Sequence, residues 1–94
     1  MTKLTLTQEA YIQGNSESFL RKINSDGVEQ SDGWCGVYFE AQATDNDGNE
    51  YTVYWIPVEG FDPQDQDYGD ACDWDAPVMI LDEHNKNVIG AVEI

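Results

Sequence analysis

A stretch of alternating residues on both sides of a polar turn restricts the fold of this chain more than any other sequence feature. In residues 37–44, small or apolar side chains alternate with polar or tyrosine side chains. The alternation returns in residues 51–56, after a turn segment that contains Asp47 and Gly48. Two β-rich segments joined by an Asp-Gly turn are typical of a hairpin. The pattern therefore predicts two antiparallel strands, the second of which ends at Pro57.

Other segments extend this prediction to a whole fold. Residues 3–13 also alternate, with Gln8 as an exception on the apolar face, and predict an N-terminal strand. Residues 78–81 and 88–94 flank a polar turn and predict a second hairpin. Apolar residues within 16–23 fit one stripe of a short helix. We therefore expect a mainly β fold, with α+β as an alternative. It has about five antiparallel strands, in two hairpins plus the N-terminal strand, as a rolled sheet or small barrel.

Length and composition favour one folded domain over residues 1–94. Hydrophobic residues make up 40% and aromatic residues 12% of the chain, enough to build a core despite a net charge of -15. The sequence shows no apolar run typical of a membrane helix or a signal peptide, which predicts a cytoplasmic protein. In that compartment Cys35 and Cys72 are expected to be free thiols, with a disulfide between them as the alternative.

The acidic residues are concentrated in one part of the sequence. The 63 residues between Lys22 and Lys86 contain no Lys or Arg, sixteen acidic residues and nine of the eleven aromatic residues. Binding to nucleic acid or to anionic lipid depends on cationic side chains, so this composition argues against both ligands. A partner with a basic surface is the expectation instead.

The segment 59–76 is the strongest candidate for a binding site. It has little apolar periodicity, and loops of such length are usually functional or disordered. Six aspartates stand two or three residues apart, close enough for a partly coiled loop to imitate a row of phosphates. Aromatic residues between them suit an interface. The residues predicted to contact a protein partner are Glu59, Asp62, Asp65, Asp67, Tyr68, Asp70, Asp73, Trp74 and Asp75.

Two simpler interpretations of this segment stay open. It could be a solvated acidic loop that keeps the protein soluble, with its aromatic residues, Trp74 above all, packed on the protein's own core. It could also bind a divalent cation, because hard cations prefer several carboxylate oxygens. The candidate ligands for that cation are Asp62, Asp65, Asp67 and Asp70, although their spacing does not fit an EF-hand.

Catalysis has little support in the sequence. The single histidine, His84, lies in a predicted turn and lacks a plausible nucleophile and orienting acid. The glycines match no phosphate-binding fingerprint. We therefore expect no enzyme activity and no cofactor.

The sequence therefore predicts an acidic binding protein that covers the basic nucleic-acid-binding surface of a protein partner. In general composition, being small, acidic and β-rich, the chain resembles phage-encoded inhibitors that mimic DNA and immunity proteins that cap basic nucleases. The alternatives are the cation-binding domain and an accessory protein with no dedicated site.

Overall fold

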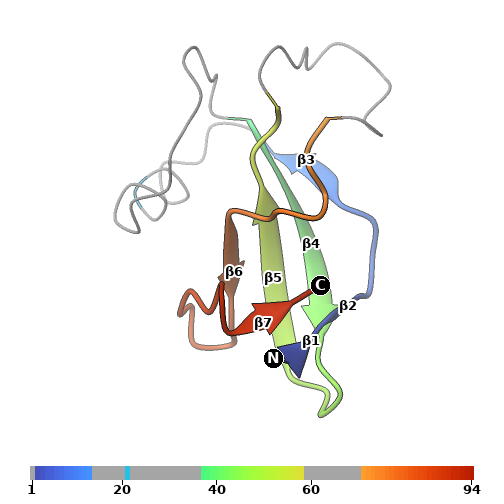
Figure 1. Ribbon diagram of the computed structural model, residues 1–94, viewed down its shortest axis with the longest axis vertical. Coiled ribbons are helices and arrows are strands. Elements are labelled where there is room, and N and C mark those ends of the chain that lie inside the picture. Colours follow the sequence, from blue (N-terminus) through green and yellow to red (C-terminus); the bar gives the residue numbers. More distant parts are fainter. Residues whose placement is uncertain (1, 14–20, 22–36, 59–70) are drawn as a thin grey trace.

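The computed structural model of the protein describes residues 2–13, 21, 37–58 and 71–94 (Figure 1). These residues contain two β-sheets, a larger antiparallel sheet and a smaller parallel one. The larger sheet has five strands in the order β2-β4-β5-β6, with β3 also paired to β4, and all its pairs are antiparallel. The smaller sheet is the parallel pair β1-β7. The strands are β1 (Thr2–Lys3), β2 (Thr5–Leu6), β3 (Tyr11–Gln13), β4 (Tyr38–Thr44), β5 (Glu50–Trp55), β6 (Met79–Leu81) and β7 (Val92–Glu93).

The mainly β, mainly antiparallel prediction is confirmed, and its central hairpin is β4-β5. The two strands pair from Phe39 opposite Trp55 to Thr44 opposite Glu50. Gly48 closes the turn with a φ of 83°, a conformation that glycine adopts without steric cost. The predicted helix near residues 16–23 lies outside the described residues, apart from Arg21.

The N-terminal segment is not the single strand that its alternation predicts. At Leu4 the chain passes from the small sheet to the large one, and the Leu4 N–H donates to the Glu93 carbonyl (2.6 Å). After β2 a bend intervenes, and the pairing with β4 resumes in β3 two residues out of register. An even shift keeps each side chain on its face of the sheet. Gln8, the polar exception to the alternation, lies in this bend outside the ladder.

The second hairpin is shorter than predicted. β6 is followed by a turn and by one antiparallel bridge between Leu81 and Asn87. The chain then leaves the large sheet, and β7 pairs in parallel with β1. The sequence could not indicate this pairing, because it joins the two ends of the chain and both strands are only two residues long.

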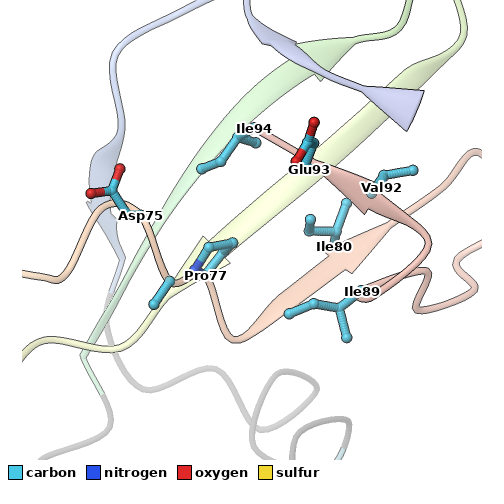
Figure 2. Close-up of a pocket in the computed structure, with 8 residues that line it drawn as sticks. Asp75, Pro77, Ile80, Ile89, Val92, Glu93 and Ile94 are labelled. Carbon is cyan, nitrogen blue, oxygen red and sulfur yellow. The ribbon is translucent and has the colours of Figure 1, made fainter. Parts of the chain in front are cut away.

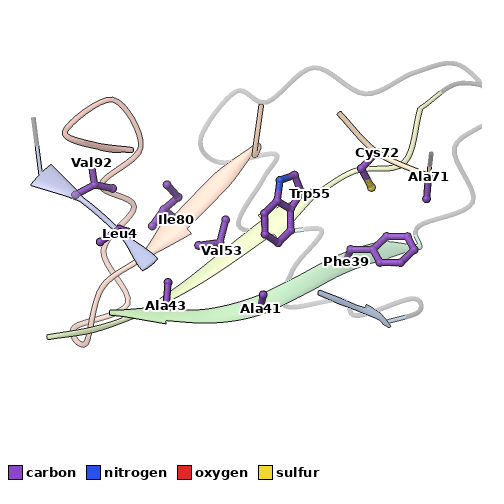
Figure 3. Packing of buried hydrophobic residues seen from close by; sticks show 10 residues of the cluster. All are labelled: Leu4, Phe39, Ala41, Ala43, Val53, Trp55, Ala71, Cys72, Ile80 and Val92. Atoms are coloured by element: carbon purple, nitrogen blue, oxygen red, sulfur yellow. The ribbon is translucent and has the colours of Figure 1, made fainter. Parts of the chain in front are cut away.

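The core lies on the face of the large sheet that β1 and β7 cross (Figure 3). Trp55, Phe39 and Val53 are almost fully buried there. At one end of the sheet Leu4 and Val92 close the core (Figure 3). Ala71 and Cys72 cover it at the other end, beside Phe39 (Figure 3).

Over the strands that the structure describes, the large sheet does not close into the small barrel that was one of the two predicted forms. Among the described residues, the β1-β7 pair packs on the sheet's face instead of joining its edges. A smaller apolar cluster, centred on Tyr38 and Met79, lies on the opposite face. In the part of the chain that the structure describes, no helix has the length and apolar character needed to cross a membrane.

Candidate functional site

The structure describes three of the nine residues predicted to contact a partner: Asp73, Trp74 and Asp75. The other six lie outside the described residues, and so do all four candidate ligands for a cation. They are Glu59, Asp62, Asp65, Asp67, Tyr68 and Asp70. Their predicted roles stay predictions. Within the described ranges, no three His, Cys, Asp or Glu side chains are grouped so that they could hold a metal ion.

The described residues on the two sides of the segment 59–70 are tied to each other. The Val58 N–H donates to the Ala71 carbonyl (2.7 Å), and this bond joins the two backbones. Pro57, Ala71 and Cys72 next to it are buried. Val58 and Ala71, the described residues next to the segment 59–70, are therefore held side by side, and they form a fixed base for the acidic segment.

Trp74 belongs to that base. Its ring packs edge-on against Phe39 (ring centroids 5.5 Å apart) and against Trp55 (5.3 Å). The Trp55 indole N–H donates to the Trp74 carbonyl (3.1 Å), which satisfies the polar atom of a buried ring. Trp74 thus holds the segment to the core, as the alternative interpretation of its aromatic residues expected. The ring is partly exposed, and its contact with a partner stays a prediction.

The two described aspartates of the predicted site differ in what they contact. Asp73 accepts the Asp75 N–H through its carboxylate (3.2 Å), and its carbonyl accepts the Ala76 N–H (3.0 Å), so it shapes a turn. The Asp75 side chain is exposed and lies at the wall of a pocket (Figure 2). Of the two, Asp75 is therefore the better placed to meet a ligand.

This pocket has a volume of about 350 Å³ and is lined mainly by apolar side chains (Figure 2). Its lining comes from the segment after Trp74, from β6 and from the C-terminal segment, and consists of Asp75, Ala76, Pro77, Ile80, Ile89, Val92, Glu93 and Ile94. Sequence reasoning missed Glu93 and Ile89 as site residues. The alternation of residue types around them predicted a strand but no pocket. The parallel pairing of β7 with β1 places Glu93 at the same pocket as Asp75.

Two other aspartates are engaged in turns of the same design. Asp45 accepts the N–H groups of Asp47 and Asn49 (both 2.9 Å), and Asp82 accepts those of His84 (2.9 Å) and Lys86 (3.0 Å). In both turns the fourth residue has positive φ: Gly48 in the first and Asn85 in the second. Such turns use the short carboxylate as a local acceptor. These carboxylates therefore stabilise the hairpins.

These hydrogen bonds lower the pKa of both carboxyl groups. The largest cause for Asp45 is the bond from the Asn49 side chain, and for Asp82 the bond from the Lys86 backbone. A lowered folded-state pKa contributes stability above the unfolded value, 3.8, which is lost as the pH falls through the folded-state pKa. We therefore expect the melting temperature to decrease as the pH is lowered from 3.8.

The variant Asp82→Asn should lose less stability than the wild type over that acid range, because its amide oxygen still accepts both N–H groups but does not titrate. Thermal unfolding followed by circular dichroism between pH 6 and about 2 measures this difference. Asp47→Asn, which removes an exposed carboxylate from the first turn, serves as the control. An acid response of Asp82→Asn identical to that of both the control and the wild type would contradict the assignment.

One buried and one half-buried side chain, Cys72 and Tyr54, are unsuited to reactive roles. Burial raises the pKa of the free Cys72 thiol to about 12, so the thiol stays protonated at neutral pH. Burial, with the negative charge of Glu40 as a further cause, raises the pKa of Tyr54 to about 12. Both groups are therefore best understood as parts of the packed structure.

Acidic side chains dominate the exposed charge of the described residues. The exposed cationic side chains there are Lys3, Arg21 and Lys86. The exposed acidic ones are Glu9, Asp47, Glu50, Asp73, Asp75, Glu83 and Glu93. No charged side chain is buried among the described residues, so these charges all act on the surface and on whatever approaches it.

Repulsion between these charges predicts that salt stabilises the protein. Raising the salt concentration from near zero to about 0.5 M shortens the screening length to a few ångströms and weakens the repulsion in the folded state. The melting temperature at pH 7 should therefore rise by several degrees, which thermal unfolding at a series of sodium chloride concentrations measures. A flat response would mean that the excess negative charge does not destabilise the fold.

Comparison with known protein families, with curated proteins and with solved structures found no match to this chain.

Proposed function

We propose that this protein is a non-enzymatic, acidic binding protein that covers the basic nucleic-acid-binding surface of a protein partner. Its carboxylates take the place of nucleic-acid phosphates on that surface. The partner is then prevented from binding its nucleic acid for as long as the complex lasts.

The observation that carries the proposal is the one-sided charge of the chain between Lys22 and Lys86. Sixteen acidic residues without a single Lys or Arg are far more than hairpin turns need. Asp45 and Asp82 are engaged in such turns and Asp73 shapes another, but the six aspartates of the segment 59–76 recur every two or three residues of the sequence. A regular row of like charge attracts and orients a cationic surface.

The fixed base of the acidic segment adds a second argument. The bond between Val58 and Ala71, together with the packing of Trp74 on Phe39 and Trp55, fixes where the segment begins and ends. Fewer ways of placing the segment reduce the entropy that is lost when a partner binds.

Affinity capture at two salt concentrations tests the proposal. The full chain is immobilised and exposed to a lysate of the cells that produce it, at about 50 mM and 200 mM salt, a range over which contacts between cations and phosphate-like charges weaken strongly. We expect a basic nucleic-acid-binding protein to be retained at the lower concentration and largely lost at the higher one. Capture of partners without a nucleic-acid-binding surface, or retention independent of salt, would contradict the proposal.

A further inference from the structure

The pocket beside β7 combines an apolar wall with carboxylates of two separate segments. Pro77, Ile89 and Ile94, which are partly or well exposed, contribute apolar surface, and Asp75 and Glu93 contribute the charged groups (Figure 2). Ile89 is 43% exposed, so a large part of its apolar surface is left for an occupant to cover. With about 350 Å³, the pocket is at the small end of the range for ligand sites and suits one side chain rather than a large molecule.

We infer that this pocket receives an arginine side chain of the protein partner. This inference rests on the proposed function, since it names a contact that the partner's basic surface would make. The methylene groups of the arginine would pack on Pro77, Ile89 and Ile94, and its guanidinium group would meet the carboxylates of Asp75 and Glu93. The pocket would thus fix the orientation of a partner that the acidic segment attracts.

Charge complementarity selects this occupant. A purely apolar side chain would cover the isoleucines but would place no positive charge near Asp75 and Glu93, on a protein whose net charge is -15. Arginine carries both an aliphatic stem and a permanent charge. Arginine is preferred over lysine because the guanidinium group is planar and presents five donors. It is also more weakly hydrated, so it loses less hydration free energy on entering a partly apolar site.

The test is a titration of the full chain, labelled at its isoleucine and valine methyl groups, with N-acetylarginine N-methylamide. Methyl NMR shifts at Ile80, Ile89, Val92 and Ile94 report on the pocket. We expect saturable shifts there, with binding roughly threefold or more weaker for the citrulline analogue, which has a similar shape but no charge. The lysine analogue should also bind more weakly than the arginine compound.

Variants locate the effect. Asp75→Asn and Glu93→Gln should each raise the dissociation constant of the arginine compound about two- to fivefold, as expected for an exposed ion pair. Asp47→Asn removes one exposed carboxylate from the β4-β5 turn and should leave the dissociation constant of the arginine compound unchanged. Equal binding of the citrulline or lysine analogue, or equal effects of the three variants, would overturn the inference.

The titration needs no partner protein, so its outcome is separate from that of the proposed function. Shifts that fail to appear in the pocket would overturn the arginine site, while salt-dependent capture of a nucleic-acid-binding partner would still support the proposed function. Shifts that appear as expected support the site even if the captured partners contradict that function.

Discussion

Replacing Trp55 by alanine is expected to lower the free energy of unfolding by about 3–5 kcal/mol. Trp55 is 1% exposed, lies in the core beside Trp74 and donates its indole N–H to the Trp74 carbonyl. The substitution removes the largest fully buried side chain among the described residues and leaves a cavity that the surrounding strands cannot fill. Because small domains are stable by only about 5–15 kcal/mol, this loss is a large fraction of the total stability.

Urea unfolding followed by circular dichroism, at one fixed salt concentration, measures this loss. Trp55→Phe keeps a buried ring but has no donor for the Trp74 carbonyl, and its loss should be smaller than that of alanine. Val58→Ala changes an apolar side chain that is 46% exposed, and we expect a change within about 0.5 kcal/mol. A loss below about 1 kcal/mol for Trp55→Ala would show that the residue is not central to the core.

Replacing Asp65, Asp67 and Asp70 together by asparagine is expected to slow association with the captured partner by roughly tenfold at low salt. Long-range attraction acts before contact, so the association rate should change more than the dissociation rate. Surface plasmon resonance with the immobilised partner measures both rates.

A matched control separates the position of the charges from their number. Glu9→Gln, Asp47→Asn and Glu50→Gln together remove three exposed charges from outside the segment 59–76. This variant should associate at nearly the wild-type rate. If it slows association as much as the first variant does, the net charge of the protein matters and the acidic segment has no special role.

The sequence was most informative where local chemistry decides the structure. The β4-β5 hairpin follows from the alternation of its strands and from its turn. In that turn the Asp45 carboxylate accepts a nearby backbone N–H and Gly48 adopts the positive φ, so all the groups involved are close in sequence. The mainly β class followed from the same alternation. The role of Trp74 in the core was open, because an aromatic residue among aspartates suits both a core and an interface until its contacts with Phe39 and Trp55 are known.

Contacts between the chain ends could not be predicted in the same way. The parallel β1-β7 pair is formed by strands of two residues, too short to show a period. The bend around Gln8 interrupts an alternation that would otherwise continue. The pocket depends on both chain ends, since β7 is held by β1 and places Glu93 near the segment that follows Trp74. The acidic and apolar residues of the pocket are therefore brought together only by tertiary contacts, which the sequence pattern does not show.

Competition with duplex DNA is the most direct measurement of the proposed function. The captured partner is bound to a fluorescently labelled duplex of its own target at low salt, and the acidic protein is then added in increasing amounts. We predict that the protein displaces the DNA completely and that added unlabelled duplex weakens its apparent affinity for the partner. A stable ternary complex, with the partner still bound to DNA at saturating protein, would contradict occlusion of the nucleic-acid surface.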